Sequence, residues 1–438
     1  MGTLDLTSSW AGLIALAVFV LAYVLVITEE FTKLRKSKPV VLAAGLIWAI
    51  IGIQYSISGQ PEILHEAIRE YLVEFAELFL FLLTAMTYVN SMNERNVFEA
   101  LRARLTSKGY TLRQLFWITG FISFFLSAVI DNLTTALVMS SVILAVGKDN
   151  KRFIAISCVN IVVAANAGGA FSPFGDITTL MVWQSGQVQF AQFFALFLPS
   201  TVNYLVPALF MSLAIRDKQL EPCTETVSMK AGARRIMVLF GLTIFLAVSF
   251  HNFLHLPPFL GMVTGLACLQ IFGYFLRRRE ALLIRHHARH VTGDVMPYDS
   301  FREVARAEWD TLLFFLGVIM SVGGLTFIGY LGHVSGYLYL ELGPTTANVL
   351  VGVLSAIIDN IPVMDAVLHM SPEMDLHQWL LVTLTAGTGG SLLSIGSAAG
   401  VALMGQARGA YSFFTHLKWL PLISLGYALG IWLHLWMN

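Results

Sequence analysis

One six-residue sequence occurs twice in the chain, with a single difference between its copies. Residues 127–132 read Ser-Ala-Val-Ile-Asp-Asn and residues 355–360 read Ser-Ala-Ile-Ile-Asp-Asn, so five of the six positions are identical. Further along, Gly-Gly at 168–169 and Gly-Asp at 175–176 correspond to Gly-Gly at 389–390 and Gly-Ser at 396–397, at one constant offset. The chain is therefore expected to contain two structural repeats.

Both copies lie within long apolar stretches. Of the 438 residues, 56% are hydrophobic and only 12% are charged, and the mean hydropathy is +0.72. Soluble domains carry about a quarter charged residues, whereas runs of about 20 apolar residues suit helices that cross a hydrocarbon core of about 30 Å. A β-barrel would show short alternating segments instead. The expected fold class is an all-α polytopic membrane protein.

Two apolar segments have the wrong length for simple crossings. Residues 114–147 are too long for one crossing and too short for two, and basic residues flank both ends: Arg113, Lys148, Lys151 and Arg152. Because basic residues mark the cytoplasmic side, this segment is predicted to enter and return as a re-entrant hairpin. Residues 343–370 have no basic flank and are followed by acidic residues. They are predicted to form a second hairpin that enters from outside.

The remaining apolar segments complete two halves of opposite orientation. Each half contains five crossings and one hairpin, and because five is odd, the second half is inverted relative to the first. This topology places 26 of the 27 Lys and Arg residues on the cytoplasmic side of a bacterial inner membrane, with both termini periplasmic. The predicted domains are a first repeat at 1–215 with a broken helix at 153–184, a cytoplasmic linker at 216–235, and a second repeat at 236–438 with a broken helix at 378–405.

Glycine, proline and hydroxyl residues interrupt both broken helices. Residues 166–176 combine three glycines with a proline, and residues 387–400 hold five glycines and four hydroxyl residues. Backbone freed at membrane depth is tolerated only where protein or a water-filled cavity satisfies it, and carbonyl and hydroxyl oxygens are ligands for hard cations. Inverted repeats with interrupted helices place the substrate near the midplane, at the repeat interface.

Carboxylates within the apolar segments are the candidates for cation and proton binding. No Lys or Arg lies within an expected crossing, so the buried charge is expected to be solely acidic. Asp131 and Asp359, at the two hairpin tips, are expected to meet near the midplane. Asp176 follows the first helix break. The alternative for each is a helix N-cap, a role that Asp fills well without binding any ion.

Neutral side chains around these carboxylates are candidate ligands, although back-bonding to the local helix is an equal alternative for the hydroxyls. They are Asn132, Thr134, Thr135, Ser172, Asn360, Ser394 and Ser397. The secondary candidates are Glu77, Asp310 and Thr178. Asn166 is interpreted as an interhelical hydrogen bonder, and Asp365 as a side chain that extends outward.

Three of these segments resemble a known family. Residues 127–135, 172–179 and 355–362 are similar to motifs of the NhaD-type sodium/proton antiporters of the ion transporter superfamily. The resemblance implies exchange of sodium, with lithium as a second candidate ion, for protons that compete for the same carboxylates. Asp131 and Asp359 would then be sodium ligands. It also implies a homodimer in membrane lipid, with a mobile domain of hairpins and broken helices that moves in an elevator fashion.

Two other functions stay open. An arsenite or anion permease of the same superfamily would need cationic or neutral donors at its site. A proton-translocating subunit of a membrane complex would place Lys and Glu in chains through the membrane. The sequence holds no recognisable nucleophile, cofactor motif or nucleotide-binding loop, so neither an enzyme, a cofactor nor a nucleic-acid partner is expected.

Overall fold

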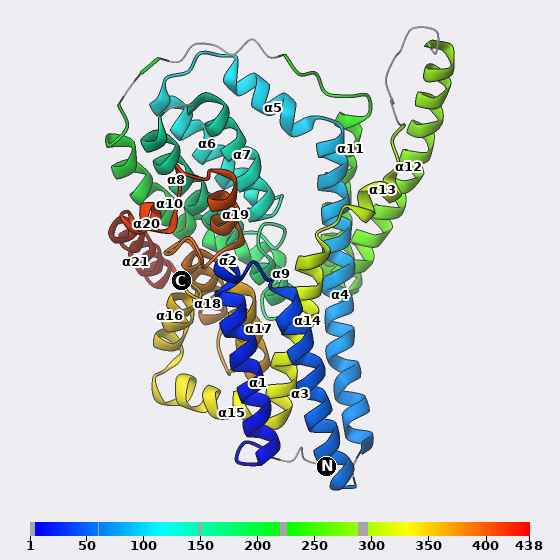
Figure 1. Ribbon diagram of the computed structural model, residues 1–438, viewed down its shortest axis with the longest axis vertical. Coiled ribbons are helices and arrows are strands. Elements are labelled where there is room, and N and C mark those ends of the chain that lie inside the picture. Colours follow the sequence, from blue (N-terminus) through cyan, green and yellow to red (C-terminus); the bar gives the residue numbers. More distant parts are fainter. Residues whose placement is uncertain (1–4, 60, 148–149, 217, 220–225, 288–296) are drawn as a thin grey trace. The chain divides into compact units, whose positions relative to one another are not determined.

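A computed structural model describes residues 5–59, 61–147, 150–216, 218–219, 226–287 and 297–438. Within these ranges every regular element is a helix (Figure 1), which confirms the all-α prediction. Lys148 and part of the expected linker at 216–235 lie outside the described residues.

Nine helices in the described part are long and apolar enough to cross a membrane. They are α1 (Trp10–Ile27), α3 (Ser37–Ile57), α4 (Pro61–Glu94), α8 (Lys151–Gly169), η1 with α10 (Phe190–Leu196 and Phe197–Leu213), α11 (Ala233–Leu254), α12 (Pro258–His287), α14 (Trp309–Ile328) and α21 (Leu420–Met437). One expected crossing, 378–405, contains no helix of this length. It is divided into α18 (Leu376–Gly389) and α19 (Ala398–Gln406). At 14 and 9 residues, neither piece spans about 30 Å by itself.

Helix pairs replace single crossings at both copies of the repeated hexapeptide. The first pair is α6 (Leu112–Ser127) and α7 (Asn132–Gly147), and the second is α16 (Pro344–Leu354) and α17 (Asn360–Met370). Helices α6 and α7 have 16 residues each, about 24 Å at 1.5 Å per residue. They are therefore shorter than the hydrocarbon core. The break after α8 is followed by α9 (Ile177–Gln184).

The remaining helices are short connections: α2 (Glu29–Thr32), α5 (Val97–Thr106), α13 (Ser300–Ala305), α15 (Tyr330–Ser335), η2 (Gly336–Glu341) and α20 (Phe413–Leu417).

The chain forms two compact units. The first consists of Met1–Leu72, Arg104–Glu225 and Leu313–Asn438, and it holds both helix pairs and both broken helices. The second consists of Val73–Ala103 and Thr226–Leu312. Inside the second unit α11 packs on α12, and the hydroxyl of Tyr88 donates to the carbonyl of Gly265 at 2.7 Å.

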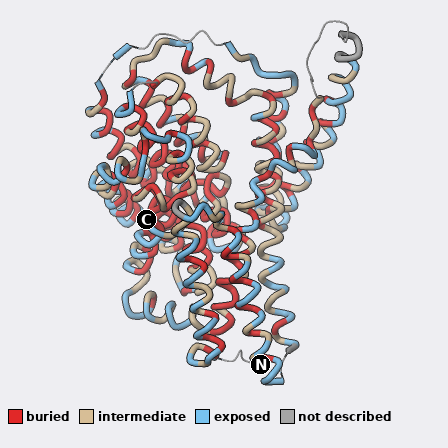
Figure 2. The backbone as a smooth tube through the Cα atoms, viewed as in Figure 1, coloured by how far each residue is buried: buried red, intermediate tan, exposed pale blue. Residues whose placement is uncertain are grey.

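Helices α8 and α18 form the core of the first unit. Almost every residue of both is buried, and this is the region where the buried segments gather in Figure 2. Helix α6 packs on α8, and α16 packs on α18 in the same way. Because protein rather than lipid surrounds these two helices, their breaks leave freed backbone groups among protein atoms.

Glycine makes these close packings possible. A Cβ atom on Gly168 of α8 would lie 2.0 Å from the carbonyl oxygen of Phe124 in α6. A Cβ atom on Gly389 of α18 would lie 2.1 Å from the carbonyl oxygen of Gly352 in α16. No side chain fits at either distance, so both approaches require glycine. The hairpins therefore lie directly against the backbone of the helices that break.

Candidate functional site

The break between α8 and α9 places a carboxylate inside the first unit. Asp176 is only 6% exposed. As the N-cap of α9, its Oδ1 accepts from the backbone N–H and from the hydroxyl of Thr178, both at 3.0 Å. These capping contacts use one carboxylate oxygen. The other oxygen, Oδ2, is contacted by residues outside α9.

Both hairpin tips reach this carboxylate. The side-chain amide of Asn132, the first residue of α7, donates to Oδ2 of Asp176 at 2.8 Å. The amide of Asn360, the first residue of α17, donates to Oδ1 at 3.2 Å and to Oδ2 at 3.1 Å. The two asparagines hold the same place in the repeated hexapeptide. One buried carboxylate thus receives neutral donors from both halves of the chain.

The hydrogen bonds continue from Asn132 to the second broken helix. Its amide also donates to Oδ1 of Asn166 at 3.2 Å, and its own Oδ1 accepts from the hydroxyl of Ser127 at 2.5 Å. The amide of Asn166 donates to the hydroxyl of Ser397 at 3.1 Å. Ser397 caps α19 by accepting from the N–H of Gly400 at 3.3 Å. Hairpin tips and helix breaks therefore meet in one network, in which Asn166 makes the interhelical bond expected of it.

Asp131 makes the contacts of a helix cap. Its two oxygens accept from the backbone N–H and from the hydroxyl of Thr134, each at 2.8 Å. The hydroxyl of the next residue, Thr135, bonds back to the carbonyl of Ile130 at 3.3 Å. The side chains that converge from the two tips are thus the asparagines that follow Asp131 and Asp359. A cation-binding role for Asp131 stays a prediction.

Asp359 behaves differently from Asp131. Its side chain makes no capping bond to α17. Its Oδ2 lies 2.7 Å from the ammonium nitrogen of Lys36, just before α3, and that nitrogen lies 4.3 Å from the centre of the Phe314 ring. A half-buried ammonium group from a connecting segment therefore reaches this hairpin tip, where only acidic charge was expected. No pattern in the sequence indicates this contact, because Lys36 belongs to a run of basic residues in a connecting segment.

The hydroxyl candidates in the two breaks have local partners. The hydroxyl of Ser172 accepts from the N–H of Phe174 at 3.3 Å, and that of Ser394 donates to the sulfur of Met404 at 3.3 Å. Both serines are buried. Their contacts shape the turns in the breaks, and their role as cation ligands stays a prediction.

Two secondary candidates belong to the second unit. Glu77 lies within α4 and Asp310 in the first turn of α14, and both are half-buried. A basic residue is buried in this unit as well, since Arg95 is 2% exposed and its guanidinium lies 2.5 Å from a carboxylate oxygen of Glu280. Arg95 follows α4 in a connecting segment, so it does not test the expectation about charge within the crossings.

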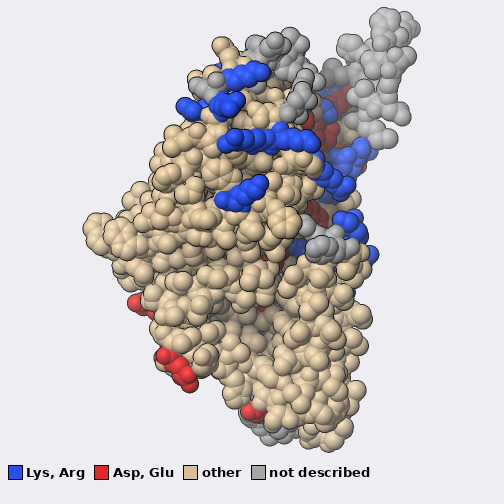
Figure 3. Space-filling view, turned by 60° about the vertical axis from the view of Figure 1, so that its left-hand side comes forward, with Lys and Arg blue, Asp and Glu red and all other residues tan. Residues whose placement is uncertain are grey.

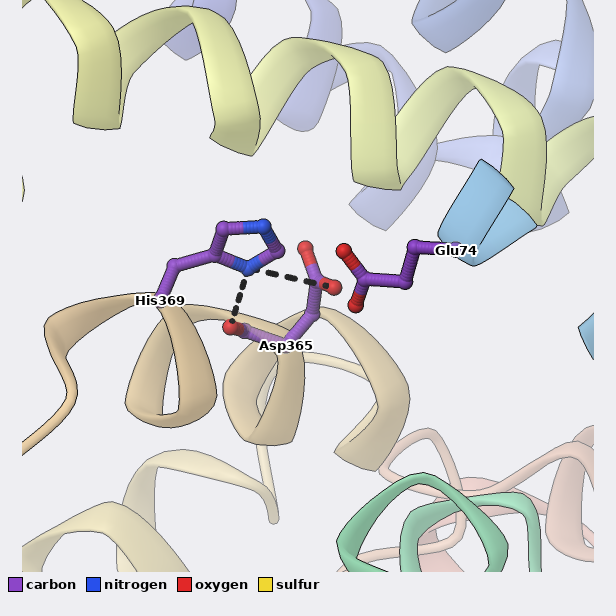
Figure 4. A group of neighbouring side chains, drawn as sticks. All are labelled: Glu74, Asp365 and His369. Atoms are coloured by element: carbon purple, nitrogen blue, oxygen red, sulfur yellow. Dashed lines mark hydrogen bonds and ion pairs between the residues drawn. The ribbon is translucent and has the colours of Figure 1, made fainter. Parts of the chain in front are cut away.

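Asp365 does not extend outward as expected. Its side chain is fully buried in α17. One turn later, Nδ1 of His369 donates to the backbone carbonyl of Asp365 at 2.9 Å and lies 3.5 Å from its Oδ1 (Figure 4). The signal in the sequence was the spacing of four residues, which places an acidic and a basic side chain together on one helix face.

The sequence is similar to known transporters over most of its length. Residues 7–387 match the model of the citrate transporter family. The chain is 57% identical to a Na(+)/H(+) antiporter NhaD of Vibrio cholerae serotype O1, over 99% of this chain and 94% of the relative. It is 58% identical to the NhaD of Alkalimonas amylolytica, over 99% and 92%, and 33% identical to sodium/proton antiporter 1 of Arabidopsis thaliana, over 98% and 74%. These similarities cover the motifs at 127–135, 172–179 and 355–362 and both broken helices. The chain therefore belongs to the NhaD-type sodium/proton antiporters of the ion transporter superfamily.

Proposed function

We propose that this protein exchanges sodium ions for protons across a bacterial inner membrane, with Asp176 at the centre of the site. The observation that carries the proposal is the convergence of Asn132 and Asn360 on this buried carboxylate. The names of the relatives, which are sodium/proton antiporters, support the choice of ions.

The exchange rests on competition for one negative charge. Sodium is a hard cation that binds an ionised carboxylate and neutral oxygens, whereas a proton neutralises the carboxylate and removes its attraction for sodium. A side-chain amide presents an oxygen in place of its nitrogen when it rotates by half a turn. Asn132 and Asn360 donate to Asp176 in the state described here, and after such a rotation they would offer oxygens to sodium. The neighbouring ligands that we propose are Asp131, Thr134, Asp359 and Ser397.

We also propose that the two halves are inverted repeats whose interrupted segments move together, as in an elevator. Matched packing supports the repeat: a Cβ atom on Gly175 would lie 2.4 Å from the carbonyl oxygen of Ser127, and one on Gly396 would lie 2.7 Å from that of Ser355. The hydrogen bonds that link both hairpins and both breaks support a common movement, because separate movement of any one segment would break them.

The proposed orientation has both termini in the periplasm. On the face of the first unit that Figure 3 brings forward, Lys and Arg side chains gather in the upper part, whereas the exposed acidic side chains at the left edge lie lower. Such a separation supports a cytoplasmic side at the basic end. A homodimer, and lithium as a second transported ion, are further parts of the proposal.

The test uses everted membrane vesicles with a pH-sensitive dye. Respiration acidifies the lumen, and added sodium should restore the fluorescence in vesicles that carry the protein. Asp176→Asn should abolish this response, because Asn keeps the cap on α9 but lacks the charge. Asp375→Asn is the matched control: Asp375 is exposed and caps α18 by accepting from the N–H of Gln378 at 2.9 Å. A normal response with Asp176→Asn would refute the proposed site.

The same vesicles test the anion alternative. The side chains that donate to Asp176 in the described structure are two amides and one hydroxyl, and none of them is basic. A bound citrate would face the carboxylate of Asp176, and the ammonium group of Lys36 at the same hairpin tip is already paired with Asp359, so citrate should not be carried. Uptake of labelled citrate that continues after sodium is removed would favour the permease instead.

A further inference from the structure

The ion pair between Lys36 and Asp359 places a cation of the protein itself at the second hairpin tip. The two side chains are 18% and 13% exposed, and 2.7 Å separates the ammonium nitrogen from Oδ2 of Asp359. Asp359 directly precedes Asn360, which donates to Asp176. Any change in the partner of Asp359 therefore acts one residue away from the proposed sodium site.

The surroundings of Asp359 are those of a cation site. Burial of an ammonium group is costly unless a negative charge or a polarisable surface replaces its water. Asp359 supplies the charge, and the face of the Phe314 ring, 4.3 Å from the nitrogen, supplies the second contact. Lys36 thus occupies a place that attracts cations in general.

The other oxygen of Asp359 is not paired by Lys36. Oδ1 is buried and has no hydrogen-bond partner among the described residues, and the side chain does not cap α17. A carboxylate in a protein interior normally has both oxygens satisfied. A single ammonium group leaves this carboxylate incompletely paired.

We propose that Lys36 is a tethered competitor of sodium: its ammonium neutralises Asp359 while the site lacks sodium, and it leaves Asp359 when sodium binds. The inference rests on the proposed function and adds a residue that sets the apparent affinity for sodium. Asp359 also lies near Asp176, because the amide of the next residue, Asn360, donates to both oxygens of Asp176. Without a counter-ion, the two carboxylates would repel each other and attract external cations more strongly.

Two substitutions should shift the sodium affinity in opposite directions. Lys36→Gln removes the competing charge, so half-maximal sodium should fall about three- to tenfold. Lys36→Arg keeps the charge and offers a planar fork that binds both oxygens of a carboxylate. It should therefore hold Asp359 more firmly and raise half-maximal sodium by a similar factor. Lys38→Gln is the matched control, because Lys38 is an exposed neighbour on the same stretch of chain.

The experiment measures sodium-dependent thermal stabilisation of purified protein, together with sodium titrations in proteoliposomes. In an Asp359→Asn background, Lys36→Gln should cause no further shift, because the competing pair is already lost. Unchanged or weakened sodium affinity in folded Lys36→Gln, or equal effects of the Gln and Arg variants, would overturn the proposal. If Lys36→Gln does not fold, the Arg variant decides alone by the direction of its shift. Wild-type protein that shows no response to sodium would instead refute the proposed function.

Discussion

Asn132 and Asn360 donate to the same carboxylate, that of Asp176, although they lie in different halves of the sequence. Each hydrogen bond to a charged group contributes about 1.5–3 kcal/mol. If the amides also bind sodium, Asn132→Ala and Asn360→Ala should each weaken the apparent sodium affinity by about 10- to 100-fold. Sodium titrations of dye dequenching measure this. Because the two share a partner, the double variant should lose less than the sum of both effects; strict additivity would contradict the shared site.

Asp131 tests whether a hairpin tip needs a charge in addition to a cap. Both its oxygens bond to Thr134, and Asn caps a helix about as well as Asp. Asp131→Asn should therefore change the melting temperature little but abolish exchange at every pH. Asp131→Glu, with the charge on a longer arm, should keep some activity with weaker sodium affinity. Near-normal exchange by well-expressed Asp131→Asn would leave this residue as a cap only.

The contact of Gly168 with α6 should tolerate no side chain. In Gly168→Ala the new methyl group would lie 2.0 Å from the backbone oxygen of Phe124, and overpacking of a tight core costs about 1–3 kcal/mol. We expect lower expression and a lower melting temperature in detergent. Gly45→Ala is the control, because no atom lies within 4 Å of its Cβ position in α3, and alanine favours the helix by about 1 kcal/mol. Equal melting temperatures would contradict the packing argument.

The topology of α6 and α7 is a separate prediction. A reporter fused after Gly147 should indicate the cytoplasm, as should one placed in residues 92–113, because the short helices between them enter and return. Reporters active only in the periplasm, such as alkaline phosphatase, would give low activity at both points. High activity after Gly147 would contradict the inverted-repeat topology.

His416, in α20 between the membrane-crossing helices, should make stability depend on pH. Its Nε2 donates to the carbonyl of Ser391 at 2.9 Å, Tyr411 donates to its Nδ1 at 2.8 Å, and the ring is fully buried, so the folded protein favours the neutral imidazole. The unfolded chain has a pKa of about 6.5 and binds the proton first. Stability should therefore fall by about 1–2 kcal/mol as the pH drops from 7 to 5.

The control for this effect is His416→Gln, which keeps a donor and an acceptor but does not titrate. Its melting temperature should be lower at pH 7 but should change less between pH 7 and pH 5 than that of the wild type. An identical pH dependence of the two proteins would contradict the role of the buried imidazole.

The apolar stretches and the glycine-rich breaks were sufficient to predict the helical membrane fold, because hydrocarbon imposes length and backbone pairing on any sequence. The partner of each polar group was harder to predict. The sequence does not show that Asn132 and Asn360, rather than the aspartates before them, turn toward Asp176, because one residue changes the direction of a side chain at a helix start. The contact of Lys36 with Asp359 depends on tertiary packing alone, so no periodic pattern in the sequence indicates it.

A site assembled from two halves also affects how the protein can be divided. Asp176 belongs to the first half of the chain and Asn360 to the second. Two fragments produced by a cut within residues 216–235 would each contain only part of the proposed binding site. Neither fragment alone would therefore transport ions. Co-expression of both fragments would restore exchange only by reassembly. In cells that hold two full-length copies, one with Asp176→Asn and the other with Asn360→Ala, no subunit would contain an intact site, and such defects would not complement each other.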